Sequence, residues 1–99
     1  MRVSAKADYA ARAAAELSTA TDKPIQADRI AEAQDIPAKV LETILLELKH
    51  AGIVRSQRGP EGGYALARPA EDISVADVIR AVDGPLANVR GDRPENMEY

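Results

Sequence analysis

The chain has 99 residues, a length that allows one domain with one modest hydrophobic core. It is 45% hydrophobic but only 3% aromatic, and it has no Cys, which excludes disulfides, thiolate metal sites and thiol nucleophiles from this chain. No apolar run is long enough to span a membrane, and no signal-peptide core follows Met1. We therefore expect a cytoplasmic protein that holds no cofactor.

Charge is distributed unevenly along the sequence. The formal net charge is −3, but residues 1–68 carry 10 Lys and Arg against 9 Asp and Glu, whereas residues 69–99 carry 3 against 7. The acidity therefore belongs to the C-terminal third. Because a small nucleic-acid-binding domain needs a local basic face rather than a basic total, the charge neither supports nor excludes such a partner.

The first predicted helix covers residues 5–19, with Ser4 as its N-cap. Its apolar side chains share one face at helical spacing, and most of them are alanines, which allow another helix to approach closely. The members of this face are Tyr9, Ala10, Ala13, Ala14 and Leu17. A turn over residues 21–24 follows.

Two more helices are predicted over residues 27–33 and 38–51, separated only by a break at residues 35–37. Gly52 suits the left-handed position that ends a helix. One arc of the later helix is apolar and consists of Val40, Leu41, Ile44, Leu45 and Leu48. Its remaining arc consists of Lys39, Glu42, Thr43, Glu47 and His50. Two helices joined across so short a break are typical of a helix-turn-helix.

Beyond Gly52 the spacing changes, and residues 53–57 and 64–67 are predicted as two short strands joined by a glycine-rich tip. A fourth helix begins at Ser74, which forms a capping-box variant with Asp77, while Ile73 and Val78 form a hydrophobic staple across this start. The apolar stripe of this helix consists of Val75, Val78, Ile79 and Val82.

We therefore predict a mainly α fold with a small β-hairpin: a winged helix-turn-helix of three helices, a two-stranded wing and a fourth helix. The domain would cover residues 1–84, and residues 85–99, which lack apolar periodicity, would be a linker or tail.

The helix over residues 38–51 is the natural recognition helix, because a helix fits the major groove of DNA and presents its first turns to base edges. Lys39 could reach guanine or phosphate, Glu42 could accept from a cytosine amino group, and Thr43 could meet a thymine methyl or a phosphate. An ordinary solvated helix face is the alternative. Leu46 projects among these polar positions, so it either packs on a neighbouring helix or covers a partner surface.

The hairpin tip is the more specific signal. Gly59, Gly62 and Gly63 surround Pro60, and glycine removes bulk where backbone must approach another surface. An arginine at such a slim tip, Arg58, can enter a minor groove. The alternative is a structural turn in which Arg58 pairs with Glu61.

Several other residues have two interpretations. Lys6 could reach a phosphate or pair with Asp8 or Asp28. Further candidates for phosphate contact are Arg2, Arg55 and Arg68. Tyr64 is expected to pack in the hairpin rather than to stack on a base.

Enzymatic chemistry finds little support, because the chain has one His and no Cys. The competing function is a winged helix for protein–protein contact, with Leu46 and the acidic fourth-helix region as its surface.

Several segments in fixed order carry a family resemblance: Met1-Arg2-Val3-Ser4-Ala5-Lys6-Ala7-Asp8-Tyr9-Ala10, Ile30-Ala31, Val40-Leu41-Glu42, Ala51-Gly52-Ile53-Val54, Arg58-Gly59-Pro60-Glu61-Gly62-Gly63-Tyr64 and Ala81-Val82-Asp83-Gly84-Pro85-Leu86. From the first residue to about Leu86 the chain resembles the Rrf2 family of bacterial winged-helix regulators, which includes repressors of iron–sulfur, nitric-oxide and cysteine metabolism.

The resemblance implies a homodimer that binds double-stranded DNA at a palindromic operator as a transcriptional repressor. By position, it implies that Lys39, Glu42 and Thr43 read base edges, that Arg58 is the wing contact, and that Lys6 and Tyr9 lie near the DNA backbone.

The chain departs from the family in three respects. Pro37 stands where a Ser usually caps the recognition helix, so we do not expect that hydroxyl's phosphate contact. The cysteines that hold an iron–sulfur cluster in many members are absent. Members usually continue into a long dimerisation helix, so we expect this chain to be truncated at Tyr99.

Overall fold

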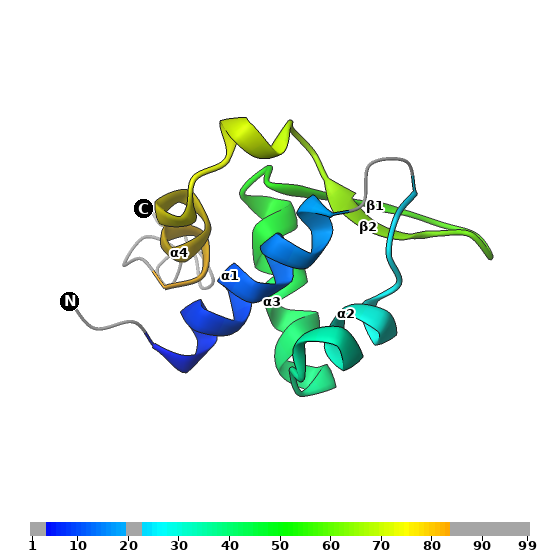
Figure 1. Cartoon of the computed structure of the whole chain (residues 1–99), viewed down its shortest axis with the longest axis horizontal. Helices are drawn as coiled ribbons and strands as arrows, with labels where there is room; N and C mark the ends of the chain where they lie inside the picture. The colour runs from blue at the N-terminus through cyan, green and yellow to red at the C-terminus, as the bar shows by residue number, and fades with distance from the viewer. Residues whose placement is uncertain (1–3, 20–22, 84–99) are drawn as a thin grey trace, which may run out of the picture.

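The computed structural model describes residues 4–19 and 23–83. The elements are α1 (Ala5–Ser18), α2 (Ala27–Gln34), α3 (Ala38–His50), β1 (Val54–Gln57), β2 (Gly63–Leu66), the 3-10 helix η1 (Ala70–Asp72) and α4 (Val75–Asp83). The hairpin β1–β2 extends from the helices on the side opposite α4 (Figure 1). This order confirms the predicted winged helix-turn-helix, except that η1 was not predicted. Arg2 and the predicted linker over residues 85–99 lie outside the described residues, so the domain boundary remains a prediction.

Helix α1 lies at the centre of the helical layer and packs against α2, α3 and α4. Its N-terminus is capped as predicted, because Ser4 Oγ accepts a hydrogen bond of 3.0 Å from the Ala7 N–H. The buried face consists of Ala7, Ala10, Ala13 and Leu17. Tyr9 and Ala14, which were expected on this face, are only half-buried, whereas Ala7 was not expected there.

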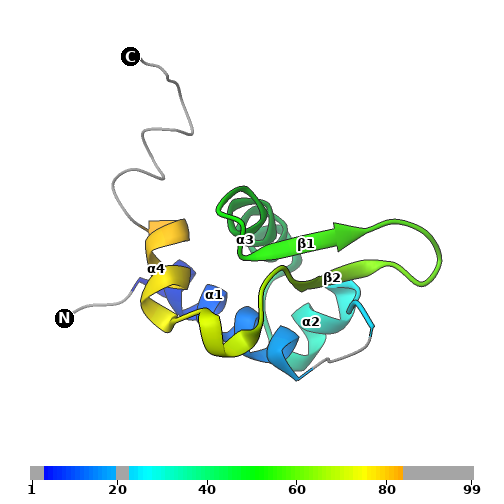
Figure 2. The ribbon, with the colours of Figure 1, turned by 90° about the horizontal axis from the view of Figure 1, so that it is seen from above.

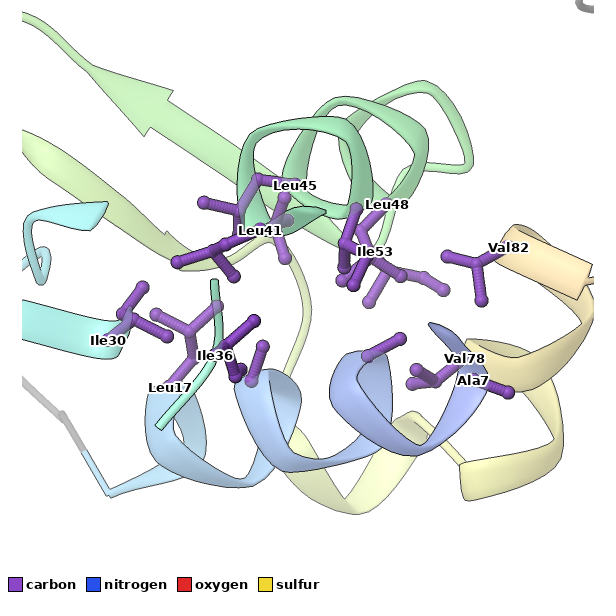
Figure 3. Packing of buried hydrophobic residues seen from close by; sticks show 14 residues of the cluster. Ala7, Leu17, Ile30, Ile36, Leu41, Leu45, Leu48, Ile53, Val78 and Val82 are labelled. Atoms are coloured by element: carbon purple, nitrogen blue, oxygen red, sulfur yellow. The ribbon is translucent and has the colours of Figure 1, made fainter. Parts of the chain in front are cut away.

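The hydrophobic core fills the space between α1 and α3 (Figure 3). Side chains from α3 point onto α1, and Ile30 of α2 and Val82 of α4 close the two ends. The buried face of α3 consists of Leu41, Ile44, Leu45 and Leu48. Ile36, in the break between helices, is also core, with 4% of its surface exposed. Short alanines on α1 permit this close packing of aliphatic side chains without large rings.

The ends of the helix-turn-helix are fixed by backbone geometry. Asp35 takes a left-handed conformation with φ 54°, and the Ile36 N–H donates to the Ala31 carbonyl at 2.9 Å. Pro37 opens α3 without any side-chain cap. Gly52 has φ 78°, and the Ile53 N–H donates to the Leu48 carbonyl at 2.9 Å, which confirms the predicted left-handed ending of α3.

The wing is an antiparallel pair of strands in which Val54 faces Leu66 and Gln57 faces Gly63. Ile25 adds a short bridge to the edge of β2, where its N–H and carbonyl exchange hydrogen bonds of 2.8 Å with Tyr64. This third segment was not predicted. Tyr64 is half-buried and packs against the core, as expected for a packing residue.

The start of α4 confirms the predicted capping box. The Ser74 N–H donates to Asp77 Oδ2 and the Asp77 N–H donates to Ser74 Oγ, both at 3.0 Å. Val78 belongs to the buried core cluster and Ile73 packs against that cluster, in keeping with the predicted staple.

Val75 was expected in the apolar stripe of α4, but that prediction is wrong, because 64% of its surface is exposed. Val75 lines a groove of about 220 Å³ together with Ala11, Ala14 and Ala15 of α1. These methyl groups are too short to cover the first turn of α4.

Candidate nucleic-acid interface

The exposed face of α3 carries the three predicted base readers. Lys39, Glu42 and Thr43 are all exposed, and none of them belongs to the buried face of α3. Thr43 Oγ1 donates to the Lys39 carbonyl at 3.4 Å, so its methyl group and both lone pairs of the hydroxyl stay available to a partner. The helix therefore rests on the core and presents these side chains outward together.

Leu46 belongs to the same exposed face. Its exposed fraction is 53%, so the first of the two alternatives, packing on a neighbouring helix, is not what the described part of the chain adopts. The other alternative, a partner surface, stays a prediction.

The wing tip is the second exposed feature. Arg58, Gly59 and Pro60 are exposed, and the tip lies far from α4 when the molecule is seen from above (Figure 2). Within residues 4–19 and 23–83 the ion pairs are Lys6–Glu47, Arg12–Asp8 and Arg80–Asp77. The alternative in which Arg58 pairs with Glu61 is therefore not what this part of the chain adopts, and the guanidinium of Arg58 is available to a partner.

The three glycines at the tip differ in how much space their surroundings leave for a side chain. A Cβ on Gly63 would lie 2.5 Å from the Ile25 carbonyl carbon and oxygen, and Gly63 also has φ 147°. A Cβ on Gly62 would collide with the Gln57 carbonyl oxygen, whereas one on Gly59 would meet open space. Gly62 and Gly63 are thus required by the hairpin itself and by the bridge at Ile25. Their presence is explained without a nucleic acid.

Lys6 pairs with neither of the partners that the sequence suggested. Its ammonium lies 2.8 Å from one carboxylate oxygen of Glu47 and 3.0 Å from the other. Asp8 pairs with Arg12 at 3.2 Å instead, and neither Lys6 nor Asp28 is linked to the other in the described residues. Because the Lys6 and Glu47 side chains are 34% and 30% exposed, their pair forms a half-covered tie between α1 and α3.

Tyr9 and Arg12 join α1 to the helix-turn-helix. The Arg12 guanidinium lies 4.9 Å from the centre of the Tyr9 ring and donates to the Gln34 carbonyl at the end of α2, at 2.8 Å. Sequence reasoning missed Arg12, although its spacing from Asp8 was a usable signal. A recess of about 350 Å³ lies beside α3, lined by Ala5, Lys6, Tyr9, Val40 and Thr43. This recess brings the predicted α1 contacts next to the predicted base readers.

No group of three or more His, Cys, Asp or Glu side chains that could hold a metal ion occurs in residues 4–19 and 23–83. No helix of this part of the chain is long and apolar enough to cross a membrane.

The sequence profile of the Rrf2 family, described as an iron-dependent transcriptional regulator, matches residues 3–98. A protein of Mycobacterium tuberculosis whose name describes an HTH-type transcriptional regulator is 52% identical over 99 residues, covering 95% of this chain. The chain spans 62% of that relative's length. The HTH-type transcriptional regulator IscR of Cereibacter sphaeroides is 38% identical over 110 residues, covering 98% of this chain and 71% of that protein.

Two solved structures share the fold. The structure of IscR from T. potens has a TM-score of 0.80 and 39% identity, covering 85% of this chain and 62% of that one. The structure of CymR, the global cysteine regulator of B. subtilis, has a TM-score of 0.81 and 30% identity, covering 99% and 75%. A four-helix order with a wing, an outward face on α3 and these matches lead to one conclusion: the chain belongs to the Rrf2 family of transcriptional regulators.

Proposed function

We propose that this chain is the DNA-reading part of a transcriptional repressor that works as a homodimer on a palindromic operator in the bacterial cytoplasm. The observation that carries the proposal is the outward face of α3, whose exposed Lys39, Glu42 and Thr43 are backed by a packed core. A rigid support of this kind is what base recognition needs, since side chains must be held in register with base edges.

In this proposal each exposed feature meets a different part of the DNA. Helix α3 enters the major groove, where Lys39, Glu42 and Thr43 reach base edges. The wing runs along the backbone and Arg58 enters the adjacent minor groove, whose negative potential attracts a guanidinium. Gly59 and Pro60 keep the tip slim, and Gly62 and Gly63 keep the hairpin closed beneath it.

The N-terminal helix would approach the phosphate backbone. An ammonium has three donors, so Lys6 can keep Glu47 and still offer a hydrogen bond to a phosphate. Tyr9, on the same recess, has a hydroxyl that can do the same. Arg2, although outside the described residues, would add a third contact of this kind.

A dimer is proposed because a single recognition helix reads only a few base pairs. Two copies related by a twofold axis would place their α3 helices in successive major grooves and would match a palindrome.

The family description names iron, and the residues of this chain do not fit an iron–sulfur cluster. Proteins hold such clusters mainly by cysteine thiolates, and this sequence has none. The described residues also bring together no group of three His, Asp or Glu side chains. We therefore propose that this chain binds DNA without a cluster held by its own residues.

The test begins with a DNA duplex that the protein selects from a random-sequence library. The proposal predicts that this duplex binds far more tightly than a scrambled duplex, with an affinity that falls steeply with salt. Arg58→Ala should weaken binding by about 1–3 kcal/mol, the range for a specific base contact.

Arg80→Ala is the matched control, because it removes the same charge from α4 at the opposite end of the molecule (Figure 1). It should leave the affinity unchanged. If the protein selects no sequence and shows no salt-dependent binding to any duplex, the proposal fails and protein–protein contact takes its place.

A further inference from the structure

Leu46 is a large apolar side chain placed in the middle of a polar, exposed helix face. The large hydrophobic residues that stand exposed in the described part of the chain are Leu46, at 53%, and Val75, at 64%. A single exposed leucine needs no explanation by itself. Its position on α3, however, is specific.

The position follows from helix geometry. Leu41, Ile44, Leu45 and Leu48 are buried against α1 and define the inward side of α3. At 100° per residue, Lys39, Thr43 and Leu46 fall within a narrow arc directly opposite that side. Leu46 therefore stands on the outermost ridge of α3, in line with two of the proposed base readers.

The spacing matches that of a helix that reads DNA. In helix-turn-helix proteins of the homeodomain type, base edges are reached from positions i, i+3, i+4 and i+7 of one helix. Lys39, Glu42, Thr43 and Leu46 have this same spacing on α3. A helix that reaches base edges from the first three of these positions can bring the fourth into the same groove.

The apolar side chain of Leu46 limits which feature of a base it can contact. Leucine has no donor or acceptor, so it cannot read the hydrogen-bonding pattern of a base pair. Thymine is the one base of ordinary DNA that presents a methyl group in the major groove, and an apolar side chain is its usual contact. Resting on the proposed function, we infer that Leu46 is a specificity-determining residue that reads the 5-methyl group of a thymine in the operator.

The test uses deoxyuridine, which pairs as thymidine does but lacks the methyl group. Each thymine of the selected duplex is replaced in turn, and binding is measured for the whole protein and for Leu46→Ala. For the wild-type protein, at least one replacement should weaken binding about fourfold, which corresponds to the loss of one buried methyl group. Leu46→Ala should weaken binding to the thymine duplex and should bind the thymine and deoxyuridine duplexes equally at that position.

Two matched variants serve as controls. Leu46→Met keeps an apolar side chain of similar size and should keep the sensitivity to deoxyuridine. Val75→Ala removes the other exposed apolar side chain, from α4, and should leave that sensitivity unchanged.

The inference is overturned if no thymine is sensitive in the wild-type protein, or if Leu46→Ala retains the same sensitivity. It is also overturned if Leu46→Ala alters self-association and leaves DNA binding as it was, because Leu46 would then cover a protein surface. In each case the selected duplex still binds, which separates these outcomes from the failure of the proposed function, in which no duplex is selected.

Discussion

The pair formed by Lys6 and Glu47 links the first helix to the recognition helix through side chains alone. Its oxygen–nitrogen distances of 2.8 and 3.0 Å describe a well-formed ion pair, but about a third of each side chain is exposed. Solvent screening at such exposure limits the contribution of an ion pair to about 1 kcal/mol or less. Its importance lies in orientation, because it fixes which way the ammonium of Lys6 points.

We predict that Lys6→Met and Glu47→Gln each lower the free energy of unfolding by no more than about 1 kcal/mol. A double-mutant cycle from urea unfolding should return a coupling of about 0.5 kcal/mol, because the double variant loses the pair only once. In DNA binding the two variants should differ. Lys6→Met should reduce the salt slope by about 1, as expected for one lost phosphate contact, whereas Glu47→Gln should not. If the wild-type protein and both variants have equal salt slopes, Lys6 does not contact the DNA backbone.

Gly63 is required by the structure of the hairpin, whereas Gly59 at the tip is not sterically required. A Cβ on Gly63 would lie 2.5 Å from the Ile25 carbonyl, so the bridge between β2 and the segment before α2 would have to open. We predict that Gly63→Ala lowers the free energy of unfolding by about 3 kcal/mol, from overpacking and from backbone strain together. Gly59→Ala, where the space is open, should cost only about 1–2 kcal/mol. Thermal unfolding without DNA checks both, and equal losses would contradict the steric explanation.

Among the elements, α4 has the best-defined start. The Ser74 backbone N–H, the Ser74 hydroxyl and Arg80 hold the pKa of Asp77 below its ordinary value of 3.8. A lowered carboxyl pKa means that the charged form stabilises the fold. This contribution is fully present above pH 3.8 and is lost as the pH falls through the pKa in the folded protein.

We predict that Ser74→Ala costs about 1 kcal/mol of stability at neutral pH, the usual cost of an N-cap. Asp77→Asn should flatten the fall in stability on the acid side of pH 3.8 while leaving Ser74 as a cap. Urea unfolding followed by circular dichroism at a series of pH values measures both. If Asp77→Asn loses as much stability at acid pH as the parent protein does, the carboxylate of Asp77 is not the source of that loss.

How well each element was predicted from sequence depends on whether its signals are local. The capping box at Ser74, the left-handed ending at Gly52 and the period of α3 involve neighbours in the chain, and all three are confirmed. The bridge at Ile25 pairs residues 39 positions apart, and no local pattern announces it. The prediction that Val75 is buried was wrong for the same reason, because its burial depends on which residues of α1 pack beside it.

In the candidate site, too, features with local signals were predicted and contacts between distant residues were not. The positions of Lys39, Glu42, Thr43 and Arg58 on exposed faces follow from helical period and turn composition, and the structure agrees with both. The partner of Lys6 could not be predicted, because Glu47 approaches it only after α1 packs across α3.

At the scale of the whole molecule, the two exposed features stand on one framework and differ in the groove that they would reach. Helix α3 is held by the core, and the hairpin leaves its C-terminal end through Gly52 without an intervening linker. The relative placement of helix and wing is therefore fixed before any DNA is met. Such preorganisation predicts that one protein reads both grooves of the same duplex at once.

Methylation interference on the selected duplex tests this most directly, because dimethyl sulfate modifies guanine N7 in the major groove and adenine N3 in the minor groove. We predict interference at both atoms for the wild-type protein, and for Arg58→Ala the loss of the adenine N3 signals with the guanine N7 signals retained. Interference confined to one groove, or a pattern unchanged by Arg58→Ala, would contradict a winged helix that reads the major groove with α3 and the minor groove with Arg58.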